Sequence, residues 1–261
     1  MKFVKKSLGQ NFLIDKNIIK KIINLVDIEN RNVLEIGPGK GALTEEILKR
    51  KPKSLILIEK DFNLAEQLKE KYSKINIVKI YSKDILKFDI EKINNKNLVI
   101  FGNLPYNISS QILVKFLKFK KWPPKVSDLI FMFQKELAEK IIGKFPSSDY
   151  GRLSILSNFR LNVLKKFLVS ANCFFPKPKI TSMVIHFQPK IEELYKIKKI
   201  SNLEKITNVF FSNKRKMIKK NIKKVLDENK LEQIQDLKLY FRPADVKPEI
   251  YYKITELFEE K

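Results

Sequence analysis

The chain has 261 residues, enough for one large α/β core and a modest second domain but not for several independent units. Hydrophobic residues make up 44% of it, which is typical of a packed globular protein and excludes a low-complexity or disordered chain. Lysine and arginine number 53 against 29 aspartate and glutamate, so the formal charge is +24 and a polyanion, first of all a nucleic acid, is the expected partner.

Short apolar runs rich in β-forming residues alternate with helical patterns from Asn32 onward. This alternation predicts a parallel sheet covered by helices on both faces, because parallel strands are joined by crossover helices. Two later runs, 160–169 and 182–187, flank the segment FFPKPK and are expected to close the sheet as an antiparallel pair. The fold class is therefore α/β, with a Rossmann-like sheet of seven strands. The first five strands are expected at 32–36, 54–59, 75–81, 98–102 and 128–133.

The pattern changes after Gln188-Pro189, where only helical spacing remains. We therefore predict two domains, an α/β domain over residues 1–190 and a small all-helical C-terminal domain over residues 191–261. The helices of the second domain are expected at 203–211, 214–226, 231–239 and from about 248.

The segment LEIGPGKGALTEEI places Gly37, Gly39 and Gly41 where a strand turns into a helix, so the backbone can approach a ligand closely. Glu59 ends the second strand, where doubly wound folds place a carboxylate for a cofactor's ribose hydroxyls. Asp84 follows the third strand and offers an acceptor for a cofactor adenine amino group. The alternatives stay open: the glycines also fit NAD-binding proteins, Glu59 a solvated carboxylate and Asp84 a helix N-cap.

The tetrapeptide Asn103-Leu104-Pro105-Tyr106 directly follows the strand LVIFG, at the edge where an open α/β sheet presents its chemistry. These residue types suit adenine N6, an amine whose lone pair is delocalised into the ring until its hydrogens are held out of plane. The Asn103 side chain and the Leu104 backbone supply two carbonyl acceptors for those hydrogens. Pro105 helps to fix the chain direction, and Tyr106 is expected to stack on the extruded base. The simpler alternative is a Pro turn without a catalytic role.

The adenine amine would attack a methyl group that a cofactor carries on a positively charged sulfur. This reaction is an in-line displacement that requires no general base with a shifted pKa. This agrees with a chain that has one histidine, His186, and one cysteine, Cys173. Those two residues can form neither a disulfide nor a His/Cys metal cluster, so no metal is expected. The start of the chain lacks the apolar run of a signal peptide, and no stretch reaches the ~18 apolar residues of a membrane span. We expect a cytoplasmic monomer without a membrane partner.

The sequence resembles the KsgA (RsmA) family of small-subunit ribosomal RNA adenine N6,N6-dimethyltransferases, and the motifs that carry the resemblance run in order over nearly the whole chain. The resemblance implies a class I methyltransferase domain, S-adenosyl-L-methionine as cofactor, and a precursor of the small ribosomal subunit, with its 16S RNA, as partner. The motifs are KKSLGQNFL (5–13), LEIGPGKGALT (34–44), IEKD (58–61), FGNLPYNIS (101–109), FMFQKELAEKI (131–141), YGRLS (150–154), FFPKPKITS (174–182) and FSNKRKMIKKNI (211–222).

The resemblance also assigns roles to single residues. It implies that the QNF segment closes over the cofactor and that Asn103 contacts both the cofactor and the target amine. Phe174 is implied to line the flipped base together with Tyr106, whereas its alternative is core packing beside Phe175. The cofactor-binding residues so implied are Asn11, Leu13, Gly37, Gly39, Glu59, Asp84 and Asn103.

The segment KRKMIKKNIKKV carries the lysines that we predict to contact RNA. In a helix, Ile218, Ile222 and Val225 would form its buried stripe, and the lysines on the other side would neutralise phosphates. The alternative is a solvated face with no specific contact. The predicted RNA-binding residues are Lys216, Lys219, Lys220, Lys223 and Lys224.

Three other functions compete with dimethylation of two adjacent adenosines near the 3′ end of 16S RNA. An Erm-type enzyme would methylate adenine in 23S RNA, although KSLGQNFL, YGRLS and FFPKPKITS resemble the KsgA type more closely. A non-catalytic small-subunit assembly factor would not need an intact NLPY, and an NAD-dependent oxidoreductase would need neither NLPY nor a basic helical domain.

Overall fold

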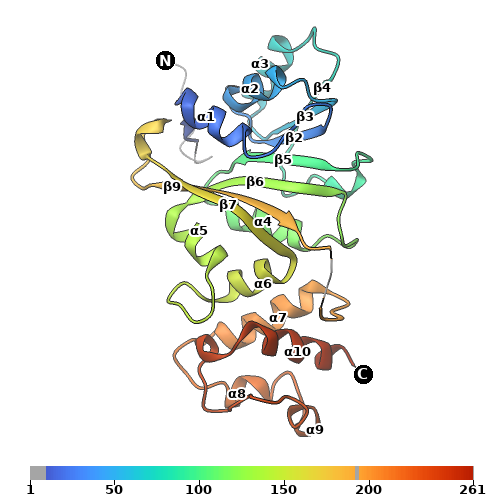
Figure 1. Cartoon of the computed structure of the whole chain (residues 1–261), viewed down its shortest axis with the longest axis vertical. Helices are drawn as coiled ribbons and strands as arrows, with labels where there is room; N and C mark the ends of the chain where they lie inside the picture. Colours follow the sequence, from blue (N-terminus) through green and yellow to red (C-terminus); the bar gives the residue numbers. More distant parts are fainter. Residues whose placement is uncertain (1–9, 192–193, 261) are drawn as a thin grey trace. The chain divides into compact units, whose positions relative to one another are not determined.

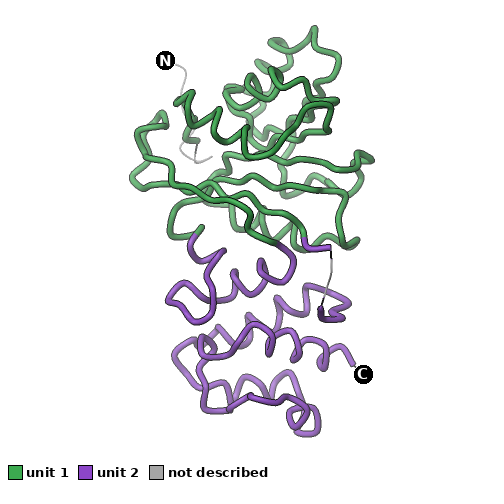
Figure 2. Tube along the Cα trace, viewed as in Figure 1, with its two compact units in different colours: residues 1–138, 162–189 green, residues 139–161, 190–261 purple. Residues whose placement is uncertain are grey.

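The computed structural model describes residues 10–191 and 194–260, and residues 5–9 of the KKSLGQNFL motif lie outside them. The chain forms two compact units, coloured separately in Figure 2. The first unit contains residues 1–138 and 162–189, and the second contains 139–161 and 190–261. The predicted division at residue 190 places residues 139–161 in the first domain, whereas in the structure they belong to the second unit.

Buried hydrogen bonds explain why residues 139–161 group with the C-terminal helices. The Tyr150 hydroxyl donates to the Val246 carbonyl at 2.8 Å, and the Tyr252 hydroxyl donates to the Ile155 carbonyl at 3.1 Å. These contacts join residues about 95 positions apart, which no local sequence pattern indicates.

The first unit is built on the predicted seven-stranded sheet, in the order β4-β3-β2-β5-β6-β9-β7 (Figure 1). Neighbouring strands from β4 to β6 are parallel, and β9 pairs with β6 in antiparallel orientation. The α/β fold predicted from the sequence is therefore confirmed. The strands are β2 (Asn32–Ile36), β3 (Ser54–Glu59), β4 (Val78–Ser82), β5 (Leu98–Asn103), β6 (Val126–Gln134), β7 (Leu161–Val169) and β9 (Ser182–Pro189).

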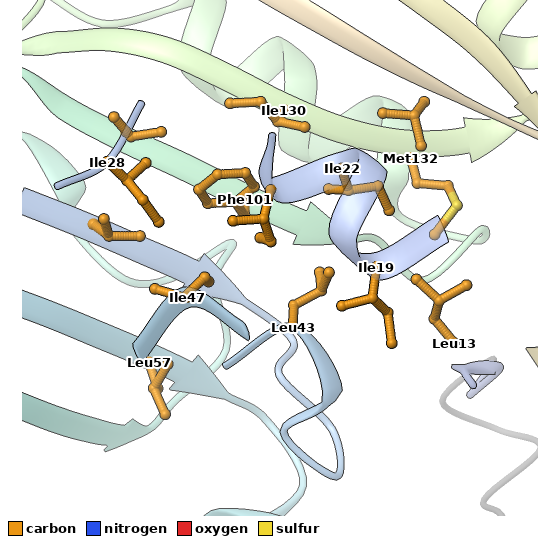
Figure 3. Packing of buried hydrophobic residues seen from close by; sticks show 14 of the residues in the cluster. Leu13, Ile19, Ile22, Ile28, Leu43, Ile47, Leu57, Phe101, Ile130 and Met132 are labelled. Carbon is orange, nitrogen blue, oxygen red and sulfur yellow. The ribbon is translucent and has the colours of Figure 1, made fainter. Parts of the chain in front are cut away.

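Helices cover both faces of this sheet. On one face, Leu43, Ile47 and Leu57 pack with Phe101 and other buried side chains into one apolar cluster (Figure 3). The helices that contribute to this cluster are α1 (Lys16–Ile23), α2 (Ala42–Lys49) and α3 (Phe62–Lys71).

On the opposite face lies α4 (Ser109–Leu117), whose Phe116 ring contacts Phe131 of β6 at a centroid distance of 5.4 Å. Phe131 alternates along the strand with Ile130 and Met132 of the first cluster, so it points to the other side of the sheet. A second, two-stranded sheet pairs β1 (Phe12–Leu13) with β8 (Phe174–Phe175). Short 3-10 turns span Ile90–Lys92 and Ala171–Cys173.

The second unit is helical, as predicted, but two of its expected helices are wrong. The helix expected at 214–226 is reduced to α8 (Lys219–Ile222), because lysines recur there at i and i+4 and like charges at that spacing destabilise a helix. The helix expected at 231–239 is replaced by α9 (Glu228–Leu231), which begins where the Asp227 side chain accepts the Lys230 N–H. The other elements of this unit are α6 (Arg152–Arg160), α7 (Ile200–Phe211), a 3-10 turn (Pro243–Asp245) and α10 (Pro248–Glu259), while α5 (Lys135–Ile142) begins in the first unit.

Among the described residues, no helix is long and apolar enough to cross a membrane. The same part of the chain contains no group of three or more His, Cys, Asp or Glu side chains arranged to hold a metal ion.

Candidate active site

A cavity of about 680 Å³ opens at the carboxyl ends of the parallel strands of the first unit. Its volume lies within the range of cofactor sites. Every residue predicted to bind the cofactor lines it, as do the four residues of the NLPY tetrapeptide. The structure thus brings together residues that are distant in the sequence: Asn11, Leu13, Gly37, Gly39, Glu59, Asp84, Asn103, Leu104, Pro105 and Tyr106.

The glycine loop between β2 and α2 has a backbone that only glycine adopts easily. Gly37, Gly39 and Gly41 have φ angles of 65°, 58° and 83°. A Cβ atom on Gly39 would lie 2.9 Å from the Phe12 ring, and the Gly37 N–H donates to the Ile58 carbonyl at 2.9 Å. The loop therefore forms one wall of the cavity with its backbone, and a side chain at Gly39 would clash with Phe12.

Glu59 is buried at the end of β3 and connects this loop to the turn that follows the strand. Its carboxylate oxygens accept the N–H groups of Gly39 at 3.0 Å and of Asp61 at 2.8 Å. Burial raises the pKa of Glu59, while these backbone donors act in the opposite direction. Because each carboxylate oxygen has two lone pairs, each can also accept from a ligand hydroxyl. The structure thus gives Glu59 a fixed position rather than that of a solvated carboxylate.

Asp84 lies just after β4 and combines a local and a long-range contact. Its side chain accepts the Leu86 N–H at 2.9 Å and pairs with the Lys60 ammonium at 2.8 Å. Lys60 lowers the pKa of Asp84, so the carboxyl group is ionised near neutral pH. No helix begins at Asp84, so the contact with Leu86 closes a turn and is not the helix N-cap considered as the alternative; the same residue also lines the cavity.

Asn103 ends β5 and is oriented by the N-terminal segment. Its side-chain Nδ2 donates to the Asn11 carbonyl at 2.9 Å, a bond across 92 positions of sequence. This bond uses one of the two amide donor hydrogens and none of the acceptor capacity of Oδ1. The N-terminal segment is itself tied to the body of the unit, because Gln10 donates to Asp61 at 3.1 Å and β1 pairs with β8.

The rest of the tetrapeptide is held by the packing of Leu104 and by hydrogen bonds of Tyr106. Leu104 is buried so close to the preceding glycine that a Cβ atom on Gly102 would lie 2.5 Å from it. The Tyr106 hydroxyl lies 2.7 Å from Ser182 Oγ at the start of β9, and its backbone carbonyl accepts the Ser109 hydroxyl at 3.1 Å. Burial raises the pKa of Tyr106, so its hydroxyl stays protonated. Tyr106 is thus held both by its hydroxyl and by its backbone carbonyl.

Phe174 takes a different position from the other residues predicted at the site. It is 3% exposed, belongs to the apolar cluster of the first unit and pairs with Leu13. It does not appear among the described residues that line the cavity, whereas the neighbouring Phe175 is 50% exposed. The core packing considered as the alternative is therefore present, and a role at the target base stays a prediction.

Sequence reasoning missed several polar residues in and beside the cavity, among them Glu35 and Ser182. Glu35 lines the cavity, is buried and accepts the Thr44 hydroxyl at 2.6 Å; burial raises its pKa to about 8. A carboxylate inside the apolar run NVLEI was the available signal, because glutamate is almost never buried without a reason. Ser182 gave no such signal, since only the folded chain brings it to Tyr106.

The predicted RNA-binding lysines are all exposed in the second unit. Lys223 pairs with Glu228 at 3.1 Å, which offsets part of its charge. The predicted apolar stripe beneath the lysines is present at Ile218 and Ile222, which are fully buried, although Val225 is half-buried. A contact between these lysines and RNA stays a prediction.

Comparison with known proteins gives the family of the chain. Residues 1–260 match the family described as ribosomal RNA adenine dimethylase. The chain belongs to this family. Among similar relatives is the ribosomal RNA small subunit methyltransferase A of Pelagibacter ubique, which is 47% identical over 98% of this chain and 97% of its own length. The protein of the same name from Mycoplasma mobile is 41% identical over 95% of each chain. The chain is thus a methyltransferase that acts on ribosomal RNA.

Solved structures agree on the fold. A dimethyladenosine transferase from Plasmodium falciparum has a TM-score of 0.75 at 24% identity, covering 93% of this chain and 95% of its own. The 23S rRNA methyltransferase ErmE has a TM-score of 0.71 at 23% identity, covering 96% of this chain and all of its own. At such identities the likeness shows the fold alone, so it does not distinguish the two types of substrate.

Proposed function

We propose that this protein transfers methyl groups from S-adenosylmethionine to N6 of two adjacent adenosines near the 3′ end of small-subunit ribosomal RNA. The observation that carries the proposal is the shared cavity, in which Glu59 and Asp84 lie with Asn103 and Tyr106 along the carboxyl edge of one sheet. One side of the cavity suits a nucleoside-bearing cofactor, and the other suits an aromatic amine.

The residues present fit the cofactor. The loop with positive φ at Gly37 and Gly39 lines the cavity with backbone and carries no side chain at these two positions. Glu59 supplies acceptors for ribose hydroxyls, and ionised Asp84 supplies an acceptor for an adenine amino group. When bound, S-adenosylmethionine supplies an electrophilic methyl group on a positively charged sulfur. An NAD-type oxidoreductase is not favoured, because the family is one of methyltransferases.

The protein's own contribution to the chemistry is positioning. The Asn103 amide is held through Nδ2, so its Oδ1 can accept a hydrogen from the target amine. The Leu104 carbonyl would accept the second hydrogen, and the anchored Tyr106 ring would stack on the base. With both hydrogens held out of the ring plane, the nitrogen lone pair is available for attack. No side chain need act as a strong base.

The choice of the small subunit rests on the relatives. The proteins from Pelagibacter ubique and Mycoplasma mobile are named for the small subunit and cover nearly the whole chain. The +24 charge supports an RNA partner of either type. The alternative, methylation of 23S RNA, is therefore an outcome that the experiment must distinguish.

The test is mass spectrometry of RNA from unmethylated small and large ribosomal subunits after incubation with the protein and labelled S-adenosylmethionine. We expect two methyl groups on each of two adjacent adenosines of the small-subunit RNA. Label in the large-subunit RNA would replace this proposal with the Erm-type activity, and binding without label would favour an assembly factor.

Asn103→Ala serves as the control for the catalytic assignment. It removes an acceptor that aligns the amine in the transition state, so it should abolish most turnover at saturating RNA and cofactor while weakening binding less. Near wild-type turnover in this variant would remove Asn103 from the mechanism.

A further inference from the structure

A second cavity, of about 390 Å³, lies within the second unit and shares no residue with the cofactor cavity. Four separate stretches of that unit contribute to it: the loop before α6, the end of α6, the segment before α7 and the start of α10. The functions described above make no use of it. Its lining residues include Lys144, Phe145, Phe159, Lys190, Tyr195, Lys247, Glu249 and Tyr252.

Aromatic rings form a continuous surface in this cavity. The ring centroids of Tyr252 and Phe159 are 5.0 Å apart, and those of Tyr252 and Tyr195 are 5.1 Å apart. Tyr252 is buried and fixed through its hydroxyl, which donates to the Ile155 carbonyl, whereas Tyr195 is half-buried. Tyr195 is therefore the accessible ring, and the buried rings of Tyr252 and Phe159 support it from behind. A partly accessible ring held in place by such packing is a surface on which a single-stranded base stacks.

The charge of the lining is positive. Lys144 and Lys247 are exposed, and Lys190 is half-buried with its ammonium donating to the Asn158 carbonyl at 2.6 Å. Burial lowers the pKa of Lys190. Among the described residues that line the cavity, Glu249 is the only carboxylate. The cavity therefore combines stacking surfaces with cations suited to a phosphate, which is the chemistry of a nucleotide.

We propose that this cavity binds one unpaired nucleotide of the RNA substrate, with its base against Tyr195 and Tyr252 and its phosphate beside Lys144 and Lys247. The inference rests on the proposed RNA substrate but not on the methylation chemistry. The cavity has the size of a small-ligand site, and a base stacked within a duplex cannot present its face to a ring. The site is thus selective for single-stranded RNA.

The test is binding of fluorescent hexauridylate, and of a blunt-ended RNA duplex, to the full-length chain. Tyr195→Ala should weaken hexauridylate binding by roughly 5- to 160-fold, because one stacked base is worth about 1–3 kcal/mol, whereas Tyr195→Phe should retain binding. Tyr240→Ala is the matched control, since Tyr240 is 61% exposed beside Lys238 in the same unit but outside the cavity. Binding of the duplex should change little in all three variants.

Replacing Lys144 and Lys247 together with Gln should flatten the log–log salt dependence of hexauridylate binding by up to ~1.4 units. The proposal is overturned if folded Tyr195→Ala binds hexauridylate like wild type, or if Tyr240→Ala weakens binding equally. A response to the lysine changes alone would show a phosphate site without base stacking and would also overturn it. Failure of methylation with these binding results intact would reject the proposed function instead.

Discussion

Tyr106→Phe tests the hydrogen bond that joins the catalytic tetrapeptide to β9. The tyrosine hydroxyl lies 2.7 Å from Ser182 Oγ, and Ser182 is 0% exposed. Removing the tyrosine hydroxyl leaves the buried serine hydroxyl without this partner, which should cost about 1–3 kcal/mol of unfolding free energy. Ser182→Ala should cost less, about 0.5–1.5 kcal/mol, because the half-buried tyrosine hydroxyl can turn to water in the cavity.

The double variant with both changes tests whether the two hydroxyls interact directly. Removing both partners leaves no unsatisfied hydroxyl, so the double variant should lose less stability than the sum of the two single variants. Guanidinium unfolding followed by circular dichroism measures the three differences. Additive losses would refute a direct interaction between Tyr106 and Ser182. Single-turnover methylation by Tyr106→Phe should fall by no more than about tenfold, since the ring is retained, and Tyr106→Ala should fall further.

Three other predictions follow from the site and the basic segment. Glu59→Ala should weaken S-adenosylmethionine binding by about 1.5–3 kcal/mol in a folded protein, measured by calorimetry; unchanged affinity would exclude Glu59 from the site. Changing Lys219, Lys220 and Lys223 to Gln should flatten the salt dependence of RNA binding by up to ~2.7 units without altering cofactor affinity. Glu35, whose pKa is raised to about 8 from 4.5, binds a proton more tightly in the folded state, so wild-type stability should fall as pH rises between these values; Glu35→Gln should reduce this slope and leave the part due to Glu59, and an unaltered slope would contradict the prediction.

The sequence was sufficient to predict that the expected cofactor-binding residues meet in one cavity, because its signals are local. A glycine loop, a strand-end carboxylate and the NLPY tetrapeptide each follow a strand, and parallel strands bring their carboxyl ends to one edge. The positive φ angles at Gly37, Gly39 and Gly41 are the backbone conformations expected for such a loop. The places of these three motifs at one edge of the sheet could thus be predicted without knowledge of any long-range contact.

The remaining features depend on contacts between distant residues. Ser182 contacts Tyr106, which lies 76 positions away in the sequence. Phe174 is buried where β8 pairs with β1, and strands of two residues are too short to be predicted from the sequence pattern. In the second unit, periodicity predicted the burial of Ile218 and Ile222 correctly, but the helix expected over 214–226 is wrong, because the pattern takes no account of the repulsion among its lysines. Hydrophobic spacing shows which side chains are buried more reliably than where a helix ends.

The two-stranded sheet of β1 and β8 links the two halves of the proposed site. Phe12 packs against Gly39 of the cofactor loop, and the carbonyl of the preceding Asn11 holds the catalytic Asn103 amide. The same strand pairs Leu13 with Phe174, the residue implied to act at the target base. We therefore expect a change in this short strand to disturb both the glycine loop and the orientation of the Asn103 amide. In the proposed function, residues 11–13 would thus couple the cofactor site to the adenine site through the backbone.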